Sequence, residues 1–243
     1  MWTPTALASE RRRYRGTVWR VVEAQHRIST NRLADDLADQ ARLEELAEEA
    51  KPDLPKAARE LHYLLGSPFR YGHKIASRFR KAHERPGIFY ASETEATAIA
   101  ETAYWRLRFY SRSPDFTPGN RTSEHLSFHV GVTVSRALDL TRPPFDAREA
   151  DWMHPADYSA CQDLASAARA ADVQLIRSYS VRDLAGGYNA ALLDPAGFAT
   201  ANPALGQTWH FRLEQGRLSA IAAFPGGGVY AFTAEEFGLP GVG

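Results

Sequence analysis

The residues with the clearest chemical potential lie between positions 68 and 110, in the order Arg70, Arg78, Tyr90 and Glu101. An arginine presents a planar fork of donors that can hold a phosphate through two hydrogen bonds. An aromatic ring can stack on a base, and a carboxylate can stabilise positive charge that develops on a sugar. Together these residue types suit a site for a dinucleotide.

Each of these residues also has a simpler interpretation. Glu101 could pair with Arg108 on a solvated helix face, and Arg78 could form a surface salt bridge. Tyr90 could be a core tyrosine, and Ser180, taken alone, is typical of a turn. The residues by themselves leave both interpretations open.

The elements around these residues would bring them together. Residues 88–91 form an expected buried strand, and 93–109 form an expected helix with Glu101 on one flank of its core face. The core face of that helix is formed by Ala96, Ile99, Ala100, Ala103, Tyr104 and Leu107. A loop, a strand and a helix in succession can converge on one cleft.

The remaining pattern mixes helices and strands without a repeat. Residues 17–23 and 126–134 are rich in β-branched and aromatic residues and predict strands. Residues 29–66 alternate leucines with acidic residues and predict helices, the second of which covers 56–65 and stops at Gly66 and Pro68. We therefore expect an N-terminal extension over residues 1–66 and a main domain over residues 67–243.

The C-terminal half predicts further short elements. Asp157 is a candidate N-cap for a helix that turns Tyr158 and Cys161 inward. Short strands are expected at 175–176, 189–193, 208–214 and 217–224, with Gln215 and Gly216 joining the last two as a hairpin. The order of elements predicts an α+β fold.

Composition narrows the class of protein. The 243 residues contain 29 Lys and Arg against 29 Asp and Glu, so no overall basic charge points to nucleic acid or to a membrane surface. Cys161 is the only cysteine, and the first residues lack the apolar stretch of a secretory signal, so we expect a soluble protein of the cytoplasm. No paired histidine motif indicates a metal site.

Several short motifs together resemble those of the RES domain family. They are SPFRY at 67–71, SRF at 77–79, GIFYAS at 87–92, ATAIAE at 96–101 and YSVRDLAGGYNAALLDP at 179–195. The motifs follow in the family's order and spacing, and they span about Phe69 to Pro195. None of them is specific alone, so their combination carries the resemblance.

The resemblance implies an ADP-ribosyltransferase-like fold in which two small facing β-sheets, flanked by helices, form a cleft for NAD. It implies catalytic roles for Arg78, Tyr90, Glu101 and Ser180, of which Arg78, Tyr90 and Ser180 would also bind NAD. Arg70 and Tyr71 resemble a further pair at the cleft. Arg80 and Arg20 are two other candidates for the principal arginine.

The resemblance also implies a function. Family members are toxins of bacterial toxin-antitoxin pairs that degrade NAD, so we expect NAD as a substrate, with no permanently bound cofactor and no metal. The bond between nicotinamide and ribose would be cleaved, with phosphate or water as the acceptor. The expected partner is an Xre-type antitoxin, to which residues 29–66 could contribute an interface or merely packing, and homo-oligomers are a family expectation.

Two other functions are compatible with the sequence. The same cleft could transfer ADP-ribose to a protein, as a mono-ADP-ribosyltransferase does. Alternatively, the chain could keep the fold as a binding module without turnover. Labelled NAD and substitution of Glu101 or Arg78 distinguish these alternatives.

Overall fold

The computed structural model describes residues 2–24, 36–113 and 122–241, and within them the fold is α+β as predicted. The strands are β1 (Arg12–Glu23), β2 (Phe89–Ser92), β3 (Thr122–Asp139), β4 (Leu175–Tyr179), β5 (Tyr188–Leu192), β6 (Ala204–Glu214), β7 (Arg217–Ala222) and β8 (Val229–Thr233). The helices are α1 (Pro4–Ser9), α2 (Leu37–Glu49), α3 (Tyr63–Arg70), α4 (Glu95–Ser111), α5 (Glu149–Met153) and α6 (Ser159–Ala170). The expected helix start at Ser29 and most of the expected loop after residue 111 lie outside the described residues.

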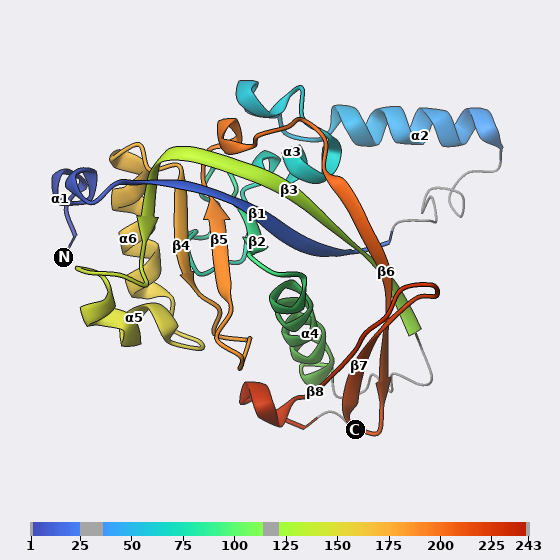
Figure 1. The fold of residues 1–243 in the computed structure, drawn as a ribbon. Coiled ribbons are helices and arrows are strands. Elements are labelled where there is room, and N and C mark those ends of the chain that lie inside the picture. Colours follow the sequence, from blue (N-terminus) through green and yellow to red (C-terminus); the bar gives the residue numbers. More distant parts are fainter. Residues whose placement is uncertain (1, 25–35, 114–121, 242–243) are drawn as a thin grey trace.

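The strands form one connected sheet around a long central pair. β1 and β3 are antiparallel from Arg12 opposite Ala137 to Glu23 opposite His125, and they arch over the molecule (Figure 1). On one side β2, β5 and β4 bridge back from β1 to β3, whereas β6, β7 and β8 extend from the other side of β3. The two expected small sheets are therefore two groups of strands joined through the β1–β3 pair.

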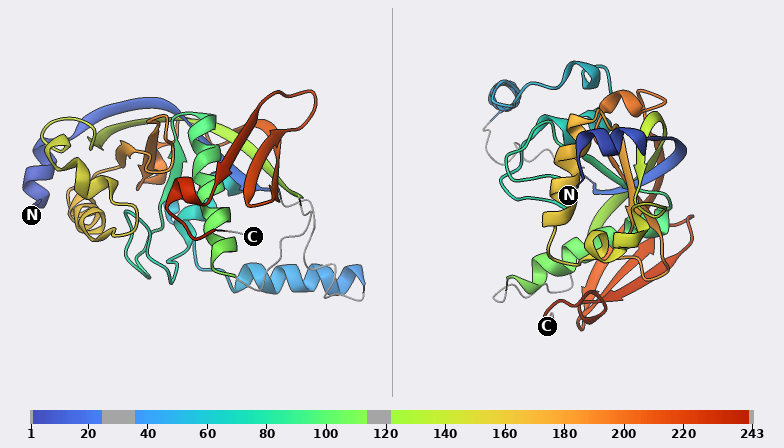
Figure 2. Two further views of the ribbon diagram at one scale, coloured as in Figure 1. Left: turned by 90° about the horizontal axis from the view of Figure 1, so that it is seen from below. Right: turned by 90° about the vertical axis from the view of Figure 1, so that its left-hand side faces the viewer.

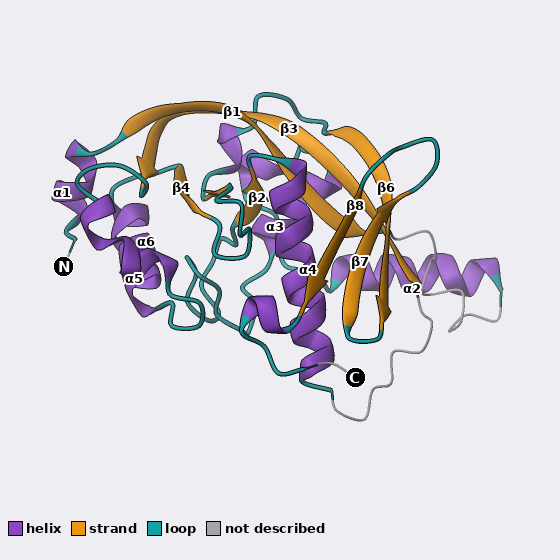
Figure 3. Cartoon of the chain, turned by 60° about the horizontal axis from the view of Figure 1, so that its bottom comes forward, coloured by secondary structure: helices purple, strands orange, loops and turns teal. Residues whose placement is uncertain are grey.

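These two groups lie toward opposite ends of the molecule. Figure 2 shows β6, β7 and β8 at the end away from α1, α5 and α6. Helix α4 lies between the groups and packs against β1 and β2 as well as β7 and β8 (Figure 3). It starts where the Thr94 side chain accepts a hydrogen bond from the backbone N–H of Thr97 at 3.1 Å, a typical N-cap.

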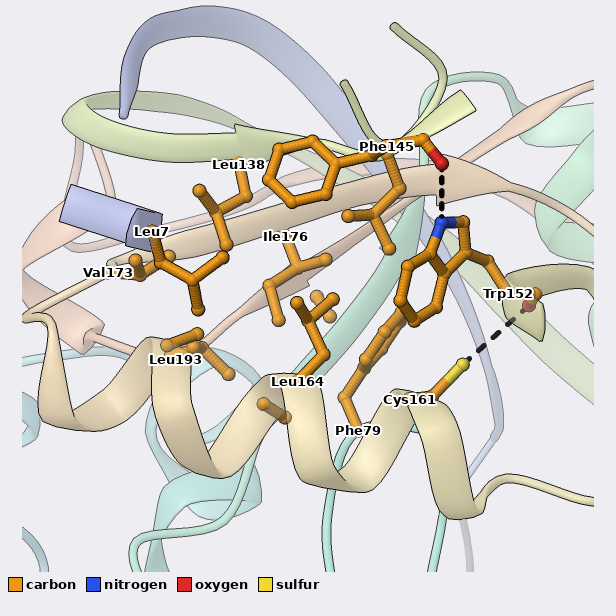
Figure 4. Close-up of a cluster of buried hydrophobic side chains, with 14 of the residues drawn as sticks. Leu7, Phe79, Leu138, Phe145, Trp152, Cys161, Leu164, Val173, Ile176 and Leu193 are labelled. Carbon is orange, nitrogen blue, oxygen red and sulfur yellow. Dashed lines mark hydrogen bonds between the residues drawn. The ribbon is translucent and has the colours of Figure 1, made fainter. Parts of the chain in front are cut away.

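Buried apolar residues form three clusters around this framework. One lies between α6 and strands β3 and β4 and includes Phe145, Trp152 and Leu164 (Figure 4). In it, Trp152 Nε1 donates to the carbonyl of Phe145 at 2.8 Å. The second cluster lies between α3 and the sheet, and the third between α4 and β6–β8. Each cluster buries one face of a helix, which stabilises the positions of α3, α4 and α6.

The N-terminal helical region differs in detail from the expectation. Residues Lys56–Ala58 form only a 3₁₀ turn, and α3 begins at Tyr63 because His62 Nδ1 accepts a hydrogen bond from the N–H of Leu64 at 3.3 Å. Pro68 lies inside α3 and does not stop it. Helix α2 extends outward from the body of the protein (Figure 1).

None of the helices in the described part of the chain has both the length and the apolar character needed to cross a bilayer. Nor do these residues include three His, Cys, Asp or Glu side chains grouped where they could hold a metal ion.

Candidate active site

A cavity of about 340 Å³ opens between α4, β1, β2 and β5. Its charged lining residues are Arg20, Arg78, Arg182 and Glu101. Aromatic residues and small polar residues make up much of the remaining wall, and they include Trp19, Tyr90, Tyr104, Trp105, Tyr158, Ser92, Ser178 and Asn189. Three cations against one carboxylate make this cavity favourable for an anionic ligand with flat rings.

Glu101 lies in the second turn of α4 and points its carboxylate into the cavity wall. Its Oε1 accepts two hydrogen bonds, from Ser180 Oγ at 2.7 Å and from Asn189 Nδ2 at 2.6 Å. Within the described residues Oε2 accepts none. One oxygen is therefore held by the protein, and the other is left for a ligand.

Ser180 lies in the turn between β4 and β5 that faces the helix. Its hydroxyl oxygen also accepts hydrogen bonds from the backbone N–H groups of Arg182 at 3.2 Å and Asp183 at 3.1 Å. Thr97 Oγ1 donates to Asp183 Oδ2 at 2.7 Å, so the turn is fastened to the first turn of α4. Ser180 thus links the geometry of this turn directly to Glu101.

Arg78 reaches the cavity from the loop before β2. Its Nη1 donates to the carbonyls of Trp152 at 2.6 Å and His154 at 3.1 Å, and its guanidinium lies 4.6 Å from the Tyr158 ring centroid. Both of these hydrogen bonds use Nη1, and the guanidinium also lies beside the Cys161 thiol. Nε and Nη2 make no hydrogen bond to oxygen or nitrogen in the part of the chain that the structure describes. They can therefore donate to a phosphate group as a pair.

Tyr90 fixes the loop that carries Arg78. Its hydroxyl shares a hydrogen bond with Ser77 Oγ at 2.8 Å and accepts another from the N–H of Phe79 at 3.0 Å. Burial raises the pKa of Tyr90, so the hydroxyl stays protonated at neutral pH. The Tyr90 hydroxyl is hydrogen-bonded to the loop and so helps to hold Arg78 in position, while the Tyr90 ring lines the cavity.

The other two candidate arginines occupy different environments. Arg80 is only 4% exposed and donates to the carbonyls of His73, Ile75 and Lys81, so it stabilises the loop and does not line the cavity. Arg20 does line the cavity, with its guanidinium 5.1 Å from the Phe89 ring centroid. Burial lowers the pKa of Arg20 to about 10, which still leaves it cationic at pH 7.

Arg20 has no carboxylate partner among the described residues. A partly buried guanidinium without an anion is less favourable than one that a ligand's negative charge neutralises. We therefore count Arg20 with Arg78 as an anion-binding candidate.

Arg70 and Tyr71, which were expected beside the cleft, lie outside the lining of this cavity. Arg70 belongs to the last turn of α3 and lines a separate hollow with the segment at 49–59, and neither residue lines the cavity.

Three residues that contribute directly to the site were not among the expected site residues, although Asn189 was expected to secure the loop after Gly186 and Gly187. Arg182 is 5% exposed, stacks 3.6 Å above the Tyr104 ring centroid and donates to the carbonyl of Pro155. Asn189 contacts Glu101, and Trp105 lies one turn after Glu101 on α4 with 48% of its surface exposed. For Arg182 and Trp105, the only sequence signal of a place in the site is their spacing from Ser180 and from Glu101.

The chain matches a known protein family. The family model described as the RES domain matches residues 53–214, which is most of the chain and includes Glu101, Ser180 and the arginines at 78 and 182. This chain belongs to the RES domain family. The resemblance stated from its motifs is thereby confirmed.

Solved structures include a weak similarity to this RES domain protein. A solved structure, titled as the crystal structure of the M. tuberculosis MbcT-MbcA toxin-antitoxin complex, matches with a TM-score of 0.46 and 17% identity. The alignment covers 84% of the RES domain protein and 91% of that chain. A search of curated proteins found no match.

Proposed function

We propose that this protein consumes NAD by cleaving the bond between nicotinamide and ribose, and that it acts as the toxin of a toxin-antitoxin pair. The observation that carries the proposal is Glu101, which has one oxygen fixed by Ser180 and Asn189 and the other free in a cavity with three arginines. Membership of the RES domain family supports the same function.

The chemistry requires what this carboxylate can supply. When the bond between C1 of the ribose and the nicotinamide nitrogen breaks, the electron pair leaves with nicotinamide and positive charge develops on the ribose. A carboxylate oxygen beside that carbon stabilises the transition state more than the ground state. Phosphate or water then forms the new bond to C1, with loss of a proton when water is the acceptor. Glu101 Oε2 is the group that performs this stabilisation.

The arginines would hold the pyrophosphate of NAD. Arg78 can donate from Nε and Nη2, while Arg20 adds a partly buried positive charge on the β1 side of the cavity. Fixing the pyrophosphate positions the ribose against Glu101, so loss of either arginine would weaken binding and slow the reaction together. The rings of Trp105 and Tyr158 offer flat surfaces for the heterocycles.

The decisive experiment measures nicotinamide release from NAD by purified protein, with and without inorganic phosphate. We expect Glu101→Gln to lower the rate by about 100-fold or more while the Kd for NAD stays within about threefold. Glu235→Gln, which removes an exposed carboxylate that does not line the cavity, is the control. Release that depends on phosphate identifies a phosphorylase, and equal release without phosphate identifies a glycohydrolase.

The same assay tests the alternatives. Transfer of label from NAD to protein would replace this proposal with a mono-ADP-ribosyltransferase. Absence of any release by folded protein, free of a partner, would favour a binding module without turnover.

A neutralising antitoxin of the Xre type completes the proposal, because depletion of NAD would harm the cell that makes the enzyme. Occlusion of the cavity is the inhibition that the site favours, since its rim exposes Trp105. Helix α2 extends from the body and is accessible to such a partner (Figure 1). Replacing residues 36–50 by a short Gly-Ser linker tests its part: retention of the antitoxin in co-purification would leave α2 outside the interface.

A further inference from the structure

Three polar residues lie abreast on neighbouring strands beneath Glu101. Asn189 of β5 is the register partner of Ser92 on β2 and of Ser178 on β4. All three line the cavity. Register partners on adjacent strands point to the same side of a sheet, so this row forms a polar strip under α4.

Two hydrogen bonds join this strip to Glu101. Ser92 Oγ donates to Asn189 Oδ1 at 2.7 Å, and Asn189 Nδ2 donates to Glu101 Oε1 at 2.6 Å. Ser92 is 2% exposed, so little of its surface faces bulk water. An ionised carboxylate can accept hydrogen bonds but cannot donate them. The Asn189 amide must therefore present its nitrogen to Glu101 and its oxygen to Ser92.

The two donors to Glu101 come from independent parts of the chain. Ser180 approaches from the turn after β4, whereas Asn189 approaches from within β5. A single donor would let the carboxylate rotate about that contact, but two donors to the same oxygen fix its plane. Oε2 is consequently directed away from both donors.

We propose that Asn189, held in place by Ser92, is a positioning residue that orients Glu101 so that Oε2 faces the ligand. The inference rests on the proposed NAD cleavage for its kinetic consequence, although the orientation itself does not require it. Asn189 touches no reacting atom and acts through Glu101 alone. A residue that only packed the sheet would affect stability and leave the protonation behaviour of Glu101 unchanged.

Asn189→Asp is the sharpest test because it keeps the shape and replaces the donor with a second carboxylate. Two carboxylates in contact share a proton, so the ¹³C signal of the Glu101 carboxyl should titrate at a higher pH than in the wild type. Glu101→Gln assigns that signal. Asn202→Asp adds the same charge at an exposed position and should leave the titration unmoved.

The kinetic readout separates positioning from binding. In Asn189→Asp we expect kcat for nicotinamide release to fall by about 10- to 100-fold with KM changed less than about threefold, and the acidic limb of the pH profile to move upward. Ser92→Ala frees the Asn189 amide to rotate and should lower kcat by about three- to tenfold. This variant tests the inference if Asn189→Asp does not fold. Unchanged kcat in Ser92→Ala, or an unmoved Glu101 titration in folded Asn189→Asp, overturns the inference.

The two proposals fail in different ways. If the wild type releases no nicotinamide, the proposed function is wrong, and the titration of Glu101 still decides whether residue 189 contacts its carboxylate. If the wild type releases nicotinamide and Asn189→Asp behaves like Asn202→Asp in both readouts, the positioning role is wrong and the function stands.

Discussion

Ser180 donates its hydroxyl hydrogen to Glu101 Oε1 across 2.7 Å, although the two residues are 79 positions apart in the chain. The contact joins a helix to the turn between two strands on the other side of the cavity. It depends on the N–H groups of Arg182 and Asp183, which hold the same hydroxyl oxygen in place. The carboxylate is therefore oriented by a turn whose own shape is fixed by backbone hydrogen bonds.

Removal of that hydroxyl tests its contribution to the reaction. We expect Ser180→Ala to lower kcat by about tenfold, because one of two hydrogen bonds to a carboxylate is lost, with KM for NAD changed less than about threefold. Initial rates of nicotinamide release measure this. Ser219→Ala on β7 is the matched control, and equal rates in both variants would contradict a role for Ser180.

We expect Arg78 and Arg80 to have different roles, which the free energy of unfolding and the KM for NAD distinguish. Arg80→Ala removes a buried guanidinium that donates to three carbonyls, so the free energy of unfolding in urea should fall by about 2–4 kcal/mol. Arg78→Gln should alter stability by only about 1 kcal/mol but raise KM for NAD at least tenfold, through loss of a bidentate phosphate contact. A larger loss of NAD affinity in folded Arg80→Ala than in Arg78→Gln would assign the ligand role to Arg80.

Much of this architecture follows from local sequence signals. The expected helix at 93–109 matches α4 closely, because an N-cap threonine precedes a regular apolar pattern. The hairpin between β6 and β7 is confirmed, and Gln215 and Gly216 both have positive φ, at 49° and 74°. That backbone shape is what a two-residue hairpin turn requires.

The features that the sequence did not predict depend on pairing between distant segments. β1 begins at Arg12, five residues before the expected strand, because its start pairs with the end of β3. Strand β8 was not predicted, because the glycines before it indicated a turn. It forms because it pairs with β7. The contact of Asn189 with Ser92 and Glu101 likewise arises from strand register, which no local pattern around residue 189 reveals.

The stability of the protein should fall on acidification because of His125. Burial, and then the neighbouring charge of Arg106, lowers the pKa of His125 from 6.5 to about 4. Below pH 6.5 the unfolded chain takes up a proton that the folded chain rejects, so stability is lost as the pH falls from 6.5 toward 4. The melting temperature should drop by roughly 5 °C more in the wild type than in His125→Gln over this range.

A histidine elsewhere on the same sheet provides the control for that measurement. His210→Gln on β6 leaves the contact between His125 and Arg106 intact, so its melting temperature should follow the wild-type pH dependence. Equal slopes for His125→Gln and the wild type would show that other groups cause the acid sensitivity.

Gly187 tests whether the turn after β4 must lie against α4. A Cβ at this position would overlap Thr97 Oγ1 and Asp183 Oδ2, the two atoms whose hydrogen bond fastens the turn. We expect Gly187→Ala to displace the turn, lower kcat by about tenfold or more through Ser180, and reduce stability by about 2 kcal/mol. In Gly186→Ala the added Cβ would contact no atom, and the only cost is the positive φ of 81°, which alanine adopts with strain. We expect a loss of about 1 kcal/mol of stability with kcat largely retained. If the two variants lose kcat equally, backbone strain in the turn, and not its contact with Thr97, controls the position of Ser180.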